Sequence, residues 1–322
     1  MAVDDAGATF SATPPLECVR MLLSLAMSYP AARRGSYNED DDFVLMFLDI
    51  SRAHPHAEIT RDVYTQLPEE HPGRAQGLVG KLRVCLYGVR DAGKGFEMKV
   101  FEISTKAGAI RGVRNPCLYH HAERRLSYLH HGDDFVVAGP RSQTQWLLAQ
   151  FREQLIVKER ATLGPRPTDH KTITMLHRVI HWRDAANGQP TAIEYSADPR
   201  HAEVLFAQMG FSVTTVPRGS GIKGLNATKG VTTPFVKEKV TEAKLKVVTD
   251  AEEIARFRSA CMRLAFLAMD RPELQYPSKE CARGMAGPTV RHFDLLKRAV
   301  RFLLHDPTCT WVFEQQKWPT LL

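Results

Sequence analysis

The sequence predicts an α+β fold built on an antiparallel sheet. Residues 43–48 form an unbroken apolar run bounded by charged residues, which is typical of a strand buried on both faces. Residues 126–138 show a hairpin pattern, because two strand-like runs flank Gly132, which allows a tight turn. Apolar residues recur at helical spacing before and after these strands, so helices are expected to pack on the sheet.

Helices and strands alternate in the first half of the chain. Thr13 and Pro14 suit the N-cap and first turn of a helix, and Pro30 ends it. The further elements predicted up to residue 155 are, in chain order, an acidic loop at 38–42, the strand at 43–48, a short strand at 63–64, a helix from Asp91, a strand at 117–120, the hairpin at 126–138 and an amphipathic helix through 146–155.

The second half begins after the turn-forming sequence GPRP at 164–167. Asn187 and Gly188 are a strong turn signal between strand-like runs at 173–182 and 191–195, so a second hairpin is predicted there. A helix then begins at Pro199 and is capped by Gly210. The final part is predicted to contain a linker at 212–250 and two helices, one through 257–267 and one through 293–303.

Composition limits the class of protein. The chain has 322 residues and a formal net charge of +7, a modest excess that favours a polyanionic partner but also suits an ordinary basic protein. Its six cysteines are scattered without a CxxC pair, as expected for reduced, mostly buried thiols. Without a signal-peptide pattern or a long apolar run, an intracellular location, cytoplasmic or nuclear, and no membrane contact are expected.

Three aspartates are the candidate catalytic and metal-binding residues. Asp49 follows the buried strand, and Asp133 and Asp134 lie at the hairpin turn. Adjacent carboxylates repel each other, and a divalent cation that neutralises them gives the chain a reason to hold them there. Carboxylates from adjacent strands suit two-metal phosphoryl transfer. Two plainer interpretations stay open at this point, an ordinary polar turn at 132–134 and a strand-end aspartate at 49.

The motifs around these aspartates resemble the reverse transcriptase of copia-type LTR retrotransposons. Their order and spacing carry the resemblance, which extends from about residue 11 to residue 306. The matching segments are FLDISRA at 47–53, Glu58 with DVY at 62–64 and LP at 67–68, KL at 81–82, LYGVR at 86–90 with Ala92, NPCLY at 115–119, HGDD at 131–134 in place of YVDD, LAFLA at 264–268 with DRP at 270–272, and PT at 288–289 with His292 and LKR at 296–298.

The resemblance implies a right-hand polymerase: a palm made of an antiparallel sheet with helices packed on one face, partial fingers, a thumb and a helical connection segment. It implies these boundaries: a disordered N-terminus at 1–10, palm and partial fingers at 11–162, a thumb-proximal hairpin and helix at 163–211, a linker at 212–250, and a connection region at 251–322 that precedes an absent RNase H domain.

The resemblance also implies roles for single residues. Asp49, Asp133 and Asp134 would be catalytic and would bind two Mg²⁺ ions, for which Mn²⁺ could substitute. Nucleotide-binding residues would be Ile50, Ser51, Arg52, Ala53, His54 and Asp91, with His54 at the position of the family's aromatic gate against the ribose 2′-hydroxyl. Nucleic-acid-binding residues would be Tyr87, Gly88, Arg90 and Lys94. Apart from the resemblance, Arg298 and Arg301 lie on a basic face of the helix through 293–303, for which nucleic-acid contact is one interpretation and ordinary solvated surface the plainer one. The implied partners are dNTPs and an RNA or DNA template with its primer.

The chain also departs from the family pattern. His131 and Gly132 replace Tyr and Val, and Asp91 replaces Gln, which adds negative charge beside a triphosphate. No match to the family's fingers strand precedes residue 11, and no RNase H, integrase or protease pattern is found. The expected function is therefore an RNA-directed DNA polymerase from a truncated retrotransposon polyprotein. The alternative is a catalytically inactive remnant that at most binds nucleic acid.

Overall fold

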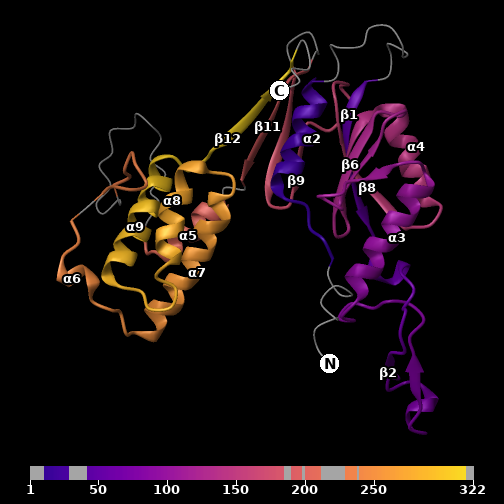
Figure 1. The fold of residues 1–322 in the computed structure, drawn as a ribbon, viewed down its shortest axis with the longest axis horizontal. Coiled ribbons are helices and arrows are strands. Elements are labelled where there is room, and N and C mark those ends of the chain that lie inside the picture. The colour runs from indigo at the N-terminus through magenta and orange to yellow at the C-terminus, as the bar shows by residue number, and fades with distance from the viewer. Residues whose placement is uncertain are drawn as a thin grey trace. The chain divides into compact units, whose positions relative to one another are not determined.

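The computed structural model describes residues 11–28, 42–184, 190–197, 200–211, 229–237 and 239–316. The chain forms two compact units (Figure 1). Unit 1 comprises residues 1–173, 181–193 and 313–322, and unit 2 comprises residues 174–180 and 194–312. The predicted disordered N-terminus, most of the acidic loop and the first part of the predicted linker, residues 212–228, lie outside the described residues.

Unit 1 contains a six-stranded antiparallel sheet. Its strand order is β4-β5-β6-β7-β1-β8, which places the first strand of the sheet between the hairpin β6–β7 and the last strand. The strands are β1 (Phe43–Ile50), β4 (Ile110–Arg111), β5 (Leu118–His121), β6 (Leu126–His131), β7 (Asp134–Pro140) and β8 (Val157–Leu163). The predicted buried strand, the predicted hairpin and its pairing with the 117–120 strand are confirmed.

Helices cover both faces of this sheet (Figure 1). On one face α3 (Ala92–Lys106) and α4 (Arg141–Arg152) share a core with Leu48 and Phe135. On the other, α2 (Leu16–Ser28) packs against β1, β6 and β7. The prediction of helices on one face was wrong, because β1 is apolar at both alternating sets of positions and each set needs cover.

A β-bulge interrupts the pairing of β1 with β8. Phe47 pairs with Ala161 and the next residue, Leu48, pairs with Glu159, so Arg160 has no partner on β1. Such a bulge redirects the extra residue's side chain and is common beside functional sites. The position of Arg160 therefore depends on how β8 pairs with β1, and no local sequence pattern predicts it.

A short exposed hairpin projects from unit 1. Its strands are β2 (Tyr64–Gln66) and β3 (Val79–Lys81), with the 3₁₀ turns η1 (His54–His56) and η2 (Pro72–Arg74) before and between them. All three residues of β2 are exposed. The predicted strand at 63–64 is thus confirmed as an edge element with little core of its own.

A second sheet has the strand order β12-β11-β10-β9, and the unit boundaries fall within its strands. They are β9 (Thr172–Met175), β10 (Arg178–Asp184), β11 (Pro190–Ala197) and β12 (Thr310–Glu314). The single strand predicted at 173–182 was wrong, because the chain turns at Leu176 and His177, whose φ angles are +48° and +59°. Two-residue turns of this conformation normally carry Asn or Gly, so the sequence showed no turn signal. The Asn187–Gly188 turn lies outside the described residues.

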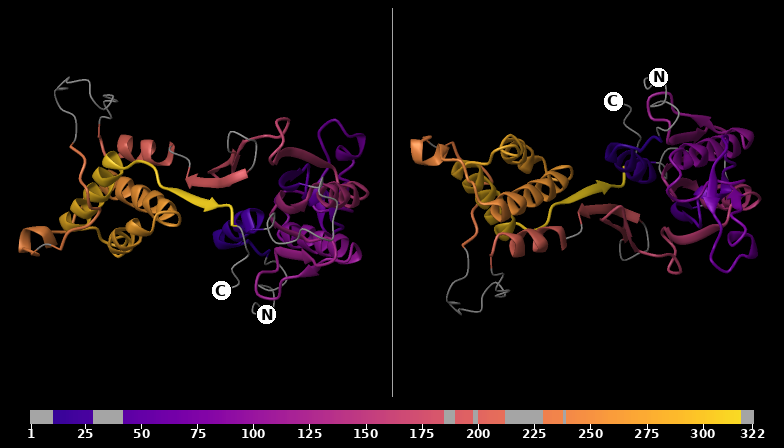
Figure 2. Two further views of the ribbon diagram at one scale, coloured as in Figure 1. Left: turned by 90° about the horizontal axis from the view of Figure 1, so that it is seen from above. Right: turned by 90° about the horizontal axis from the view of Figure 1, so that it is seen from below.

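Unit 2 is largely a helical bundle (Figure 2). Its helices are α5 (Arg200–Gln208), α6 (Glu242–Leu245), α7 (Ala251–Ala268), α8 (Pro272–Ala282) and α9 (Val290–His305). The helices predicted through 257–267 and 293–303 are confirmed as α7 and α9. Sequence reasoning missed α8, because Pro277 lies inside it, and Pro inside a helix normally disfavours that conformation.

A buried ion pair lies in the core of unit 2. Arg178 donates from Nε to Oδ2 of Asp270 over 3.0 Å, and the Tyr195 hydroxyl lies 3.3 Å from Oδ1. The guanidinium also lies 4.4 Å from the centre of the Phe266 ring. The Asp270 side chain is fully buried and that of Arg178 is 4% exposed, so each charge depends on the other.

All six cysteines are free thiols, and five of them are buried, as predicted. Among the described residues, no helix combines the length and apolar character that a membrane crossing requires.

Candidate metal and nucleotide site

The turn between β6 and β7 presents the paired aspartates. Gly132 has a φ of +62°, while the φ of Asp133 is not positive, as expected for a two-residue hairpin turn with glycine at its first central position. The Ile50 amide donates to the Asp133 carbonyl over 3.0 Å. This bond ties the turn to the end of β1, so Asp133 is held beside the strand that carries Asp49.

Charged and polar side chains form a row across the end of the sheet. Asp49 is the register partner of Asp134 on one side and of Lys158 on the other, and His131 is in turn the partner of Asp134. Directly opposed residues of antiparallel strands project to the same face, with Cβ atoms about 4.5–5.5 Å apart. The sheet therefore brings Asp49 and Asp134 together, as the sequence predicted, and places a lysine next to them.

Asp134 is paired with a cation. Arg160 donates from Nη1 to Asp134 Oδ1 over 2.9 Å, and the Asp134 side chain is 25% exposed. Burial raises the pKa of the Asp134 carboxyl, and the negative charges of Asp133 and Asp49 raise it further, while Arg160 acts in the opposite direction. The net effect is a raised pKa, so the ionised form of the Asp134 carboxyl is less favoured here than it is in water.

This donor set suits a divalent cation chemically. Mg²⁺ uses carboxylate oxygens and commonly takes only one or two protein ligands, the rest being water and phosphate oxygens. Such an ion would neutralise the negative charges that Asp49, Asp133 and Asp134 bring to this end of the sheet. Within the described residues, no three His, Cys, Asp or Glu side chains are already arranged to hold a metal. The carboxylates would have to close around an ion as it binds.

A cavity of about 380 Å³ adjoins Asp133. Three of the residues predicted to contact nucleotide or nucleic acid line it, namely Ala53, His54 and Tyr87. The rings of His54 and Tyr87 lie 4.6 Å apart, so the two side chains form one wall. The structure thus brings the predicted gate residue and Asp133 to a single cavity.

The backbone predicted to cradle a triphosphate is partly committed to other bonds. The Ile50 amide bonds to Asp133, and the Ser51 amide donates to the Ile156 carbonyl over 2.9 Å. Arg52 has a φ of +55°, an uncommon conformation for a residue other than glycine. Of the four predicted residues, Ile50 and Ser51 therefore have amides that are already engaged within the protein.

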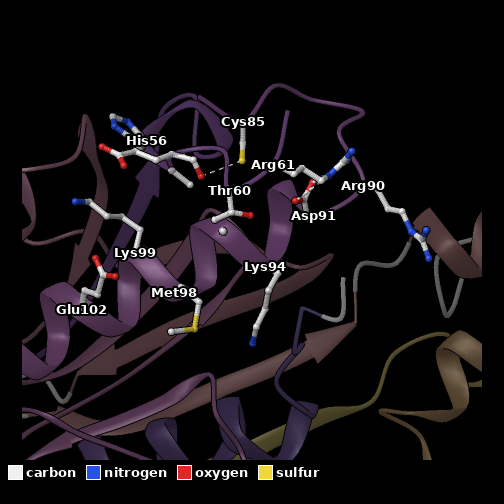
Figure 3. A pocket seen from close by; sticks show the side chains of 13 residues that line it. His56, Thr60, Arg61, Cys85, Arg90, Asp91, Lys94, Met98, Lys99 and Glu102 are labelled. Carbon is white, nitrogen blue, oxygen red and sulfur yellow. Dashed lines mark hydrogen bonds and ion pairs between the residues drawn. The ribbon is translucent and has the colours of Figure 1, made fainter. Parts of the chain in front are cut away.

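The remaining predicted residues near the helix α3 line a second, larger cavity of about 750 Å³ (Figure 3). Arg90, Asp91 and Lys94 lie there together with Arg61. Arg61 contacts Asp91 through two nitrogens at 3.1–3.2 Å, and this hydrogen bonding lowers the pKa of the Asp91 carboxyl. The negative charge that Asp91 brings is therefore balanced by Arg61, which the sequence did not link to it. Gly88, in the loop before Asp91, has a φ of +93°.

Arg298 and Arg301 belong to unit 2. Arg298 donates to the Thr233 hydroxyl and Arg301 to the Lys229 carbonyl, each over 2.8 Å. Both guanidinium groups thus hold the segment at 229–233 against α9. Their predicted contact with nucleic acid stays a prediction.

Sequence reasoning missed Arg160, Arg61 and His130. The first two lie far along the chain from the aspartates they contact, and no motif contains them. His130 lines the cavity beside Asp133, is 2% exposed, and has no hydrogen-bond partner at either ring nitrogen. Burial lowers its pKa to about 4, so the ring is neutral at pH 7. Its place directly before the HGDD segment was the available signal.

Comparison with known proteins shows a distant similarity to a transposon polyprotein. No family model matches the chain. The chain is 22% identical over 309 residues to the retrovirus-related Pol polyprotein from transposon RE1 of Arabidopsis thaliana. The aligned region covers 94% of this chain and 18% of the polyprotein, so the chain spans less than a fifth of that relative's length. This similarity supports an origin of the chain in a retrotransposon Pol polyprotein.

Proposed function

We propose that this chain is the reverse transcriptase part of a retrotransposon Pol polyprotein, an RNA-directed DNA polymerase that uses dNTPs and a primed template. The observation that carries the proposal is the pairing of Asp49 with Asp134 on adjacent strands, with Asp133 at the turn beside a cavity of about 380 Å³. The distant similarity to a Pol polyprotein supports the same assignment. Palm, fingers, thumb and connection remain proposed names for the parts of this chain.

Each residue of the site has a role in this proposal. Asp49, Asp133 and Asp134 would hold two Mg²⁺ ions. These ions would lower the pKa of the primer hydroxyl and neutralise negative charge on the phosphates. The chain's own residues do the positioning. His54 and Tyr87 would bound the sugar end of the nucleotide, and the amides of Arg52 and Ala53 would face its phosphates. Arg61 would remain paired with Asp91 and keep that carboxylate from repelling the phosphates.

Primer extension on an RNA template tests the proposal. The intact chain should extend the primer with Mg²⁺ or Mn²⁺, and Asp133→Asn should lower the rate by at least a hundredfold. The matched control is Asp62→Asn, an exposed aspartate whose pair with Lys81 lies on the β2–β3 hairpin. No extension by the unaltered chain, also when the family's fingers segment is supplied in front of it, would contradict the proposal.

The Arg160–Asp134 pair favours a second candidate, a remnant that binds nucleic acid without catalysis. In that case an arginine has replaced the metal as the permanent partner of the carboxylate. Binding of an RNA–DNA hybrid should then weaken steeply with salt, since it rests on phosphate contacts, and should not change with Mg²⁺ or with Asp133→Asn. Binding that is insensitive to salt would argue against this candidate.

A further inference from the structure

The β-bulge on β8 makes Arg160 an extra residue without a partner on β1, so its side chain need not follow the alternation of the strand. Both neighbours of Arg160 keep partners on β1, Glu159 with Leu48 and Ala161 with Phe47, while Arg160 itself is the extra residue. A bulged strand has a locally disrupted ladder, and the extra side chain is redirected. Here that side chain extends over β1 and reaches Asp134 on the far neighbour, β7.

The contact lies where a metal ligand is expected to be open. Asp134 Oδ1 accepts the hydrogen bond from Arg160 at 2.9 Å, and Asp49 faces Lys158 in the same row. An oxygen that accepts a guanidinium hydrogen bond and forms an ion pair has less charge available for a metal ion, and two cations at one carboxylate repel each other. Arginine cannot lose its proton in a protein, so its charge is permanent.

The pair is also able to open. The Arg160 side chain is 38% exposed, and long cationic side chains move their charged ends into water at little cost. We propose that Arg160 is an internal counter-cation, which stabilises the Asp134 carboxylate in the metal-free chain and must leave it before a divalent ion binds there. This inference rests on the proposed metal-dependent function, and it identifies a residue on a separate strand that tunes the site's metal affinity.

A titration with Mn²⁺ tests the inference without any assay of activity. The free ion is measured by its electron paramagnetic resonance signal. Arg160→Gln keeps a long polar side chain but removes the charge, and Arg160→Lys keeps the charge without the planar fork. The matched control is Arg166→Gln, because Arg166 pairs with Asp42 at the opposite end of the same sheet. Circular dichroism would establish that every variant is folded.

We expect Arg160→Gln to bind Mn²⁺ about three- to tenfold more tightly than the unaltered chain, the range set by removing one partly exposed ion pair. Arg160→Lys should lie between the two, and Arg166→Gln should match the unaltered chain. Unchanged or weaker binding by folded Arg160→Gln, while Asp134→Asn still weakens it, would overturn the inference alone. If Asp134→Asn leaves binding unchanged, or the chain binds no Mn²⁺, both the metal site and the inference fail.

Discussion

The ion pair of Arg178 with Asp270 makes a strong prediction about unit 2. Arg178→Met keeps much of the side-chain volume but leaves the Asp270 carboxylate, which is fully buried, without its cation. Removing one partner of such a pair costs about 3–5 kcal/mol, because the other charge stays buried and uncompensated. With a urea dependence of about 2 kcal/mol per molar, the unfolding midpoint of unit 2 should fall by about 1.5–2.5 M.

Hydrogen exchange measured by mass spectrometry across a urea series would report the two units separately. Peptides of α7 and α9 should lose protection at lower urea in Arg178→Met, while those of β1 and β7 should not change. A double variant, Arg178→Met with Asp270→Leu, should recover most of the lost stability, since no charge remains buried. A midpoint shift below about 0.3 M, or an equal shift in both units, would refute this reasoning.

Three further predictions concern unit 1. Gly132→Ala should destabilise unit 1 by about 1 kcal/mol in urea unfolding, because Gly132 has a φ of +62°; no loss would mean the turn can change conformation. The second prediction concerns Asp134→Asn. As the pH rises from about 4 to 7, the urea midpoint of this variant should fall less than the midpoint of the unaltered chain. Because the pKa of Asp134 is raised, the folded state binds the proton more tightly than the unfolded state, and ionisation of Asp134 costs stability as the pH rises. The same pH dependence in the variant and in the unaltered chain would contradict this. Arg61→Ala should change stability by less than about 1 kcal/mol, because the Arg61 side chain is half exposed. It should weaken dNTP binding, measured by fluorescence titration, because the negative charge of Asp91 is then no longer balanced.

Much of the sheet could be predicted because its signals are local. A turn glycine lies between two strand-like runs at 126–138, and six apolar residues precede Asp49, so the hairpin and the buried strand needed no knowledge of distant residues. Prediction failed where a local signal pointed elsewhere. Pro277 argued against the helix α8, and Leu176 and His177 gave no sign of the turn that they form.

The sequence by itself therefore determined the α+β class, the position of the three aspartates at strand ends and the resemblance from which a polymerase was inferred. Only the tertiary structure decided which charges meet. Arg160 reaches Asp134, Arg61 reaches Asp91 and Arg178 reaches Asp270 over separations of 26, 30 and 92 residues. The physical reason is that strand register governs side-chain contact, and one extra residue on β8 was enough to place a cation on the carboxylate proposed to bind metal.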